Sequence, residues 1–330
     1  MKKFYYLTRA IFEDEIREDE KEKIIYEIQS CKLLNDLIPY LIHHKLLCHF
    51  YALIVNYNLI TYMDKESWRL ITKNVIYEQL KSSNYGYELE KICQGLDERN
   101  IRYAILKGFH LKTFLYEKSD NLIRRIFNDI DILVEKKEIK CVNELLESMG
   151  YFKGEYDPET NSLRRYSRKE EVQFLMTSHQ SAQYIKPSVF GSTCINDVFI
   201  VDVNFSIFEG GNVPDPISTK YLLECSVEQR GSAPFFYYSL NLEHDFFQLF
   251  YHLYKDSKYE IKKTNNEQFL LCNLIDIYRY IKLNGGKINW NYVSEMLEKA
   301  NVKKEFKDLI KLLNEWTASS LVNEIYLKFE

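Results

Sequence analysis

The sequence lacks the features that mark secreted and membrane-spanning proteins. No stretch of about 18 uncharged apolar residues, which a spanning helix requires, occurs anywhere in the chain. The two lysines near the N-terminus are not followed by the sustained apolar segment of a secretory signal. We therefore expect a cytoplasmic protein with no membrane partner.

An excess of positive charge is also missing. The chain has 44 lysines and arginines against 48 aspartates and glutamates, which gives a formal net charge of −4. Its average charge does not attract nucleic acid or an anionic membrane. Among its partners, a small molecule or a peptide is thus favoured over RNA.

The cysteines lack the pattern of a disulfide framework or a zinc site. No two of them have Cys-x-x-Cys spacing, and the odd total of seven stands at positions 31, 48, 93, 141, 194, 225 and 272. Most lie within apolar runs. This pattern predicts reduced, packed thiols, as in a cytoplasmic protein.

What the chain does contain is a region of mixed periodicity between two helical regions. Residues 1–98 and 211–330 show apolar residues at helical spacing, whereas 99–210 alternates strands with helices. We predict strands at 101–106, 129–134, 172–177 and 198–207, and helices at 109–116 and 138–149, with Gly150 ending the second helix. A loop with Gly210, Gly211, Pro214 and Pro216 follows. The expected fold class is α+β with an α/β-type core: a helical region, a sheet covered by helices, and a helical tail.

Two carboxylates, Asp129 and Asp131, lie at the start of the second predicted strand. Residues i and i+2 of a strand share a face, so both project together while Ile130, Ile132 and Val134 face the core. Carboxylates held so close repel, and a bound cation keeps both ionised. The alternative is an ordinary solvent-facing strand edge, which the pattern taken alone favours.

A turn and an arginine near this pair point to phosphate chemistry. Lys107 and Gly108 stand at a strand-to-helix junction, where glycine allows phosphate to approach the backbone and the helix N-terminus presents N–H groups. Arg125 precedes the pair by four residues, and its guanidinium is suited to pair with a triphosphate. Lys107 has a second interpretation as an ordinary surface lysine.

A third carboxylate lies in the last predicted strand. Alternation puts Asp202 and Asn204 on one face of this strand, and the opposite face is apolar, made of Phe199, Val201, Val203 and Phe205. Three carboxylates from two strands next to a glycine turn form a more specific pattern than the first pair alone.

Residues 104–151 closely resemble a poorly characterised bacterial nucleotidyltransferase family of the polymerase-β-like superfamily. The resemblance lies in Ala104-Ile-Leu-Lys-Gly108, then Arg125-x-x-Asn-Asp-Ile-Asp-Ile-Leu-Val134, and Glu144-Leu-Leu-x-x-x-Gly-Tyr151. It covers most of the chain more loosely. It implies a mixed sheet of the polymerase-β-like kind with helices, flanked by helical regions.

The resemblance also implies roles for these residues. Asp129 and Asp131 bind the Mg²⁺ of a nucleoside triphosphate. Asp202 is a third carboxylate, either a metal ligand or the base that deprotonates the acceptor. The phosphates are contacted by Lys107, Gly108 and Arg125. Two magnesium ions are expected, and ATP is the expected nucleotide from its abundance.

Two positions depart from the pattern. Phe109 follows Gly108, where the wider superfamily usually has serine, and Asn204-Phe205 stands where the family often has histidine and tryptophan. The phosphate contacts then depend on the backbone, Lys107 and Arg125, and the acceptor side lacks the histidine.

Weaker candidates for the acceptor side are His179, His252 and Asp276, together with Asn204. Each has a structural alternative in packing or helix capping, which is the more common role of such residues. The resulting prediction is transfer of a nucleoside monophosphate to an acceptor hydroxyl or similar group, with release of pyrophosphate. The alternative is a catalytically silent member of this fold used for binding or scaffolding.

Overall fold

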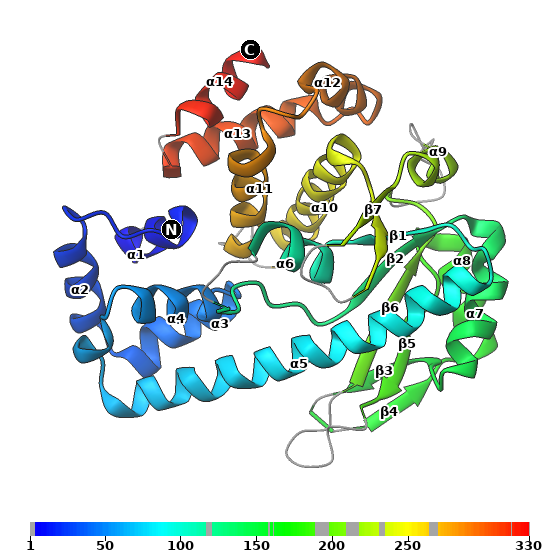
Figure 1. Ribbon diagram of the computed structural model, residues 1–330, viewed down its shortest axis with the longest axis horizontal. Helices are drawn as coiled ribbons and strands as arrows, with labels where there is room; N and C mark the ends of the chain where they lie inside the picture. Colours follow the sequence, from blue (N-terminus) through cyan, green and yellow to red (C-terminus); the bar gives the residue numbers. More distant parts are fainter. Residues whose placement is uncertain are drawn as a thin grey trace. The chain divides into compact units, whose positions relative to one another are not determined.

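The computed structural model describes residues 4–116, 121–157, 159–160, 162–188, 198–208, 218–230, 235–263, 270–317 and 319–329. The chain divides into two compact units (Figure 1). We call Ser82–Thr113 with Phe127–Asp245 the sheet unit, and Met1–Lys81, Phe114–Ile126 and Phe246–Glu330 together the helical unit. Each unit draws on more than one of the predicted regions 1–98, 99–210 and 211–330, whose boundaries stay a prediction. The predicted loop from Gly210 to Pro216 lies outside the described residues.

The sheet unit is built on a six-stranded sheet with the order β1-β2-β6-β5-β3-β4. In chain order the strands are β1 (Tyr103–Leu106), β2 (Ile130–Val134), β3 (Phe152–Asp157), β4 (Ser162–Arg165), β5 (Tyr184–Pro187) and β6 (Val198–Asn204). The β2–β6 pair is parallel and the other neighbours are antiparallel. This mixed sheet with surrounding helices confirms the predicted α+β class. A second sheet pairs β7 (Val227–Gln229) with β8 (Tyr237–Ser239).

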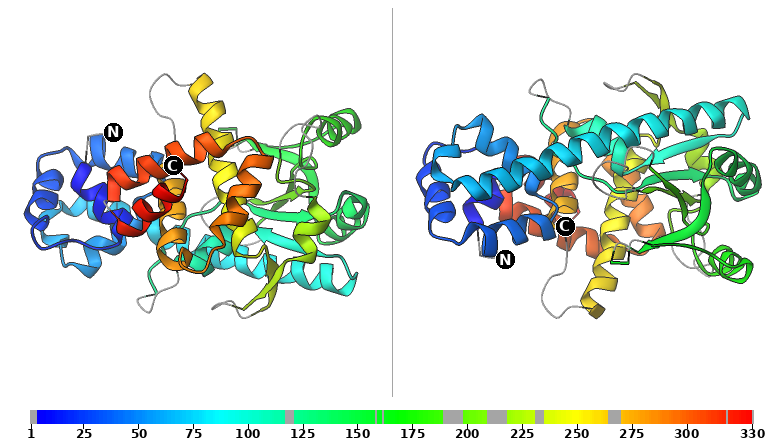
Figure 2. Two further views of the ribbon diagram at one scale, coloured as in Figure 1. Left: turned by 90° about the horizontal axis from the view of Figure 1, so that it is seen from above. Right: turned by 90° about the horizontal axis from the view of Figure 1, so that it is seen from below.

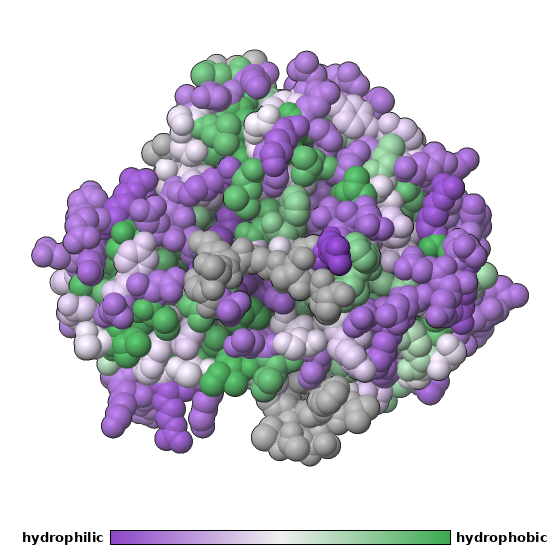
Figure 3. Space-filling view, in the orientation of Figure 1, coloured by the Kyte–Doolittle hydropathy of each residue, from purple (hydrophilic) through white to green (hydrophobic). Residues whose placement is uncertain are grey.

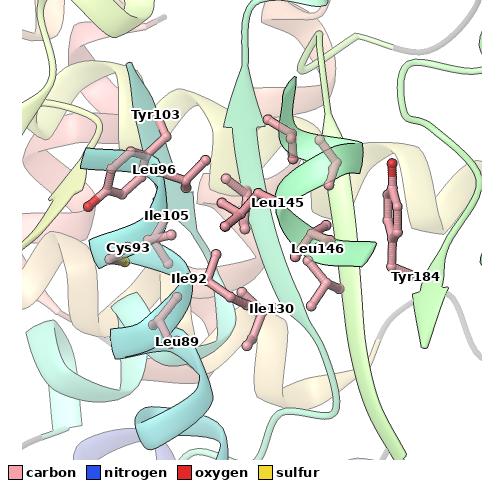
Figure 4. Close-up of a cluster of buried hydrophobic side chains, with 14 of the residues drawn as sticks. Leu89, Ile92, Cys93, Leu96, Tyr103, Ile105, Ile130, Leu145, Leu146 and Tyr184 are labelled. Carbon is pink, nitrogen blue, oxygen red and sulfur yellow. The ribbon is translucent and has the colours of Figure 1, made fainter. Parts of the chain in front are cut away.

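Two helices cover one face of the large sheet. They are the C-terminal part of α5 (Lys65–Glu98) and α7 (Ile139–Ser148). Leu89, Ile92 and Leu96 of α5 recur at three- and four-residue spacing and are fully buried, and Figure 4 shows them facing the strands. Full burial of each such side chain contributes about 1.5–3 kcal/mol.

The strands supply the other half of this core by alternation. Ile130, Ile132 and Val134 of β2 all belong to it, as predicted, and so do Phe199, Val201 and Val203 of β6. The residues between them therefore project from the opposite face of the sheet. This is the local reason why Asp131, Asp202 and Asn204 share one face.

The end of α7 is a Schellman motif, as the glycine at 150 predicts. Gly150 has a φ of +89°, the amide of Tyr151 donates to the carbonyl of Leu146 at 3.0 Å, and the amide of Gly150 donates to Glu147. The helix turns directly into β3.

The strand predicted at 172–177 is wrong, because these residues belong to α8 (Arg168–Thr177). A capping box starts this helix: the Ser167 side chain accepts from the amide of Glu170, and the Glu170 carboxylate accepts from the amide of Ser167. Val172 and Met176 stay outside the core, at 39% and 74% exposure, while Leu175 packs against it and is only partly buried. The local capping signal decides the structure here, and β3, β4 and β5 complete the sheet instead.

The helical unit confirms the helical periodicity of the flanking regions. Its helices include α1 (Tyr5–Glu13), α2 (Lys21–Gln29), α3 (Ile38–His43), α4 (Leu47–Asn56), α11 (Leu271–Asn284), α12 (Trp290–Lys299), α13 (Lys303–Thr317) and α14 (Ser320–Lys328). Helix α1 packs against α4, α11 and α13, so segments from both ends of the sequence lie side by side (Figure 2). The rings of Phe12 and Trp316 stack at 5.8 Å between centroids. Helices α5, α6 (Gly108–Tyr116) and α10 (Leu242–Lys263) each contribute residues to both units.

Two further features concern the surface and the thiols. Hydrophilic residues cover much of the face in Figure 3, with smaller hydrophobic areas between them. Within the described ranges no single helix is long and apolar enough to cross a membrane, although the bent pair Leu33–His43 and Leu47–Asn56 meets the length and composition test together.

Six of the described cysteines are in the thiol form, outside any disulfide. Of these, Cys48, Cys93 and Cys272 are buried, and Cys194 lies outside the described residues.

Candidate active site

The parallel pairing of β2 and β6 brings two predicted carboxylates to the same level. The two strands are labelled in Figure 1. In their register Asp131 lies opposite Asp202 and Leu133 lies opposite Asn204. Asp131 is 5% exposed. Asp202 is partly exposed as a residue, but its Oδ1 is buried and has no hydrogen-bond partner in the described part of the chain. A buried carboxylate oxygen without a donor is costly. The charge of Asp131 adds to this cost.

The electrostatics of Asp202 reflect this crowding. Burial, followed by the charges of Asp131 and Asp129, raises the pKa of Asp202 to about 7, while Lys107 and a hydrogen bond from Gln183 act in the opposite direction. Neighbouring carboxylates and burial both disfavour the ionised form. The site thus carries more negative charge than its protein donors compensate.

Lys107 and Gly108 form the turn between β1 and α6, next to the carboxylates. Lys107 has a φ of +44°, in the left-handed region, and its Nζ lies 3.3 Å from Oδ1 of Asp131. A Cβ on Gly108 would lie 3.3 Å from the carbonyl oxygen of Asp129 and 3.4 Å from Cβ of Phe127. Glycine therefore allows the start of α6 to pack closely on the backbone that leads into β2.

Asn204 fastens the two strands at the same level. Its Nδ2 donates to Oδ1 of Asp131 and to the carbonyl oxygen of Asp202, both at 3.3 Å, and the residue is 4% exposed. It lies beside the carboxylates, as the alternation in β6 predicts. Its amide cannot relay a proton as a histidine does.

Asp129 lies one residue before β2, at the edge of this group, and is partly exposed. Among the residues that the structure describes, no three side chains of His, Cys, Asp and Glu are gathered closely enough to hold one ion together. Magnesium, however, is commonly bound by one or two carboxylates plus substrate phosphates and water. Asp131 and the unpartnered Oδ1 of Asp202 fit that donor set.

Gln183 is a member of the site that the sequence did not predict. Its side chain donates to Asp202, and it precedes the pair Tyr184–Val201 in the antiparallel register of β5 and β6, which puts it opposite Asp202. The sequence carries no signal for it, because β5 was not predicted.

Arg125 and Asp276 lie in the helical unit and pair with each other. Arg125 Nε donates to Oδ2 of Asp276 at 2.8 Å, and the hydroxyl of Tyr116 donates to Oδ1 at 2.5 Å. Arg125 is 8% exposed and Asp276 is fully buried. The structure thus gives each a structural partner, and their roles toward a triphosphate or an acceptor stay predictions.

The two histidine candidates occupy different environments. His252 of α10 forms a local pair with Asp256, with 3.3 Å between Nε2 and Oδ2, in the helical unit. His179 lies beside the end of β6, where its carbonyl oxygen accepts from the amides of Phe205 and Ser206. Of the two, His179 is thus connected by its backbone to the strand that carries Asp202 and Asn204.

A buried polar network near the start of α6 was also not predicted from the sequence. His110 Nε2 lies 3.1 Å from Oδ2 of Asp245, and its Nδ1 lies 3.3 Å from the hydroxyl of Tyr237, which is 2.7 Å from Oγ1 of Thr113. His110 and Asp245 are both 1% exposed. The network anchors the helix that begins at Gly108.

A family model described as "Uncharacterised nucleotidyltransferase" matches residues 33–318. The chain belongs to this nucleotidyltransferase family. No curated protein matches the sequence.

Some solved structures are distantly similar to this chain. The crystal structure of ANT(2″)-Ia in complex with adenylyl-2″-tobramycin has 12% identity and a TM-score of 0.35, with 67% of this chain and 98% of that chain covered. An antigenic nucleotidyltransferase-like protein from Paracoccidioides brasiliensis has 15% identity and a TM-score of 0.37, with 70% and 93% covered. Membership in the family rests on the family match, which supports a transferase that uses a nucleotide.

Proposed function

We propose that this protein transfers a nucleoside monophosphate from a nucleoside triphosphate, by default ATP, to an acceptor hydroxyl or similar group. The observation that carries the proposal is the unpartnered, buried Oδ1 of Asp202 beside Asp131 on adjacent parallel strands. This arrangement is unfavourable by itself and becomes favourable when a divalent cation neutralises it. The family membership supports the same class of reaction.

Asp129, Asp131 and Asp202 would hold Mg²⁺, expected as two ions, and bound Mg²⁺ would supply neutralisation of the triphosphate and of the leaving pyrophosphate. The acceptor oxygen forms a bond to the α-phosphorus, and the bond from that phosphorus to the bridging oxygen of pyrophosphate breaks. Lys107 and the backbone at Gly108 orient the phosphates. Asp202 has one of two roles: it completes the ligand set, or it accepts the proton of the acceptor hydroxyl.

The two departures from the family pattern now have structural explanations. Phe109 is 5% exposed and packs its ring among Phe127, Phe235 and Tyr237, so this position serves the core and not a phosphate. Asn204 ties β2 to β6 where a histidine would offer a proton carrier. We infer that phosphate binding relies on the backbone, Lys107 and Arg125, and that no side chain at position 204 takes part in proton transfer.

The acceptor we propose is a small molecule or a peptide or protein group, and the compartment is the cytoplasm. The formal charge of −4 supplies no general attraction to RNA. The proposed roles of Arg125 at the triphosphate, and of His179, His252 and Asp276 at the acceptor, are carried by the sequence pattern and each needs its own variant.

The test is incubation with α-labelled nucleoside triphosphates, Mg²⁺ and cell extract, with wild type beside Asp131→Asn. We expect label on an acceptor with wild type only. Glu135→Gln is the matched control, since Glu135 follows the same strand but pairs with Lys137, whose side chain is 66% exposed. Equal labelling by wild type and Asp131→Asn would contradict the proposed site. No labelling, together with no thermal stabilisation by Mg²⁺ and ATP, would favour a binding or scaffolding protein.

A further inference from the structure

The conformation of Lys107 directs its ammonium onto the carboxylates. Its positive φ is uncommon for a residue with a side chain and is maintained only where the surroundings require it. The turn is fixed on both sides, by β1 before it and by the close packing of Gly108 on Asp129 and Phe127 after it. The result is an ammonium 3.3 Å from Oδ1 of Asp131 on a side chain that is 19% exposed.

The donors at the site are distributed unevenly between its two central carboxylates. Oδ1 of Asp131 accepts from both Lys107 Nζ and Asn204 Nδ2. Oδ1 of Asp202 accepts from no described residue. Lys107 therefore pairs directly with Asp131. Its charge also acts on Asp202, whose Oδ1 still has no donor among the described residues.

We propose that Lys107 is the resident counter-cation of this site, which a divalent ion must displace from Asp131 and which then pairs with the triphosphate. This inference rests on the proposed function. An ion alone must compete with the ammonium for the same carboxylate oxygen. An ion that arrives with a nucleotide gives the ammonium a new anionic partner, so that displacement costs less. Lys107 thereby couples metal binding to nucleotide binding, and such coupling is reciprocal.

The coupling is tested by calorimetric titration of Mn²⁺ into wild type, Lys107→Met and Lys140→Met, each with and without α,β-methylene-ATP, which resists cleavage between the α- and β-phosphates. Without nucleotide, Lys107→Met should bind Mn²⁺ about tenfold more tightly than wild type, within the usual range of coupling between sites. The enhancement by the analogue should shrink by a similar factor. Lys140→Met, on an 87% exposed side chain of α7, should match wild type.

A second variant keeps the test decisive when Lys107→Met is unstable without metal. Lys107→Arg retains the positive charge and should bind Mn²⁺ alone no more tightly than wild type. Mn²⁺ affinity that is unchanged in Lys107→Met, or raised equally in Lys107→Arg, overturns the role of the ammonium. If Asp131→Asn still abolishes Mn²⁺ binding in that case, the proposed metal site stands and only the coupling is refuted. No Mn²⁺ binding by any variant, with or without nucleotide, overturns the proposed function itself.

Discussion

Asp202 in the sheet unit and Asp276 in the helical unit are both carboxylates whose pKa is raised by burial. Their neighbours differ. Asp276 receives Arg125 and Tyr116 on its two oxygens, and the charges of Arg125 and Arg279 act against the raised pKa. Asp202 faces two further carboxylates and keeps one oxygen without a donor from the described residues. Burial alone therefore does not distinguish the two carboxylates, whereas the balance of neighbouring charge does, and Asp202 is the one for which we propose a function.

The largest expected effect concerns the group of carboxylates in the sheet unit. Asp131→Asn should lower nucleotidyl transfer roughly 10³-fold, because it removes a carboxylate that would hold the cation, and the cation would neutralise the negative charge that develops on the phosphates. The measurement is the initial rate with the labelled acceptor, with circular dichroism to show that the fold is retained. A rate within a few-fold of the Glu135→Gln control would contradict the comparison.

In the helical unit, removing the charge of Asp276 should destabilise the folded protein. Asp276→Asn leaves the buried Arg125 without its counter-ion, and we expect the free energy of unfolding to fall by about 3 kcal/mol. Urea denaturation measures this change. The control is Asp256→Asn, because Asp256 is more exposed and pairs locally with His252. Equal losses in the two variants would show that the Arg125 pair contributes no more than a surface pair.

The pH dependence of stability should reveal Asp202 directly. Its pKa is about 7 in the folded protein, against an ordinary value of 3.8 that the unfolded chain is expected to have. Between these values the folded protein keeps a proton that the unfolded chain has released, so the free energy of unfolding falls as pH rises through this window. Asp202→Asn should remove this slope and raise metal-free stability at pH 8. Urea denaturation in EDTA at pH 5 and pH 8 tests it, and identical slopes for wild type and variant would refute the assignment.

The smallest effect concerns the donor that Asp202 does have. Gln183→Leu removes the hydrogen bond that lowers the pKa of Asp202, so this pKa should rise further and stability at pH 8 should fall by about 1 kcal/mol. The pH at which half of the pH-dependent stability is lost should therefore be higher than in wild type. The double variant with Asp202→Asn should show no such shift, and a shift there would mean that Gln183 acts through another group.

The sequence was sufficient for features set by local periodicity. Alternation in β2 and β6 put Asp131, Asp202 and Asn204 on the face away from the apolar core, and Gly150 marked the end of α7. It was insufficient where partners come from distant segments. Arg125 and Asp276 are 151 residues apart, and His110 and Asp245 are 135 apart, so no short-range pattern links them.

The error at 172–177 has a different origin. Apolar residues there suggested a strand, but the capping box at Ser167 and Glu170 provides local hydrogen bonds that start a helix. With that segment assigned wrongly, β5 and its neighbour Gln183 were missed. The metal ligands, the nucleotide and the acceptor depend on bound molecules, and their identities are therefore part of the proposals above.

The parallel pair in the six-stranded sheet has a consequence for the time at which the site forms. β2 and β6 are neighbours, yet Asp131 and Asn204 are 73 residues apart, and β3, β4 and β5 all lie between them in the chain. Closing such a long connection is slow compared with forming a hairpin such as β3–β4. We therefore expect the cluster of carboxylates to assemble late in folding, so that its repulsion would oppose only the last stage of strand pairing.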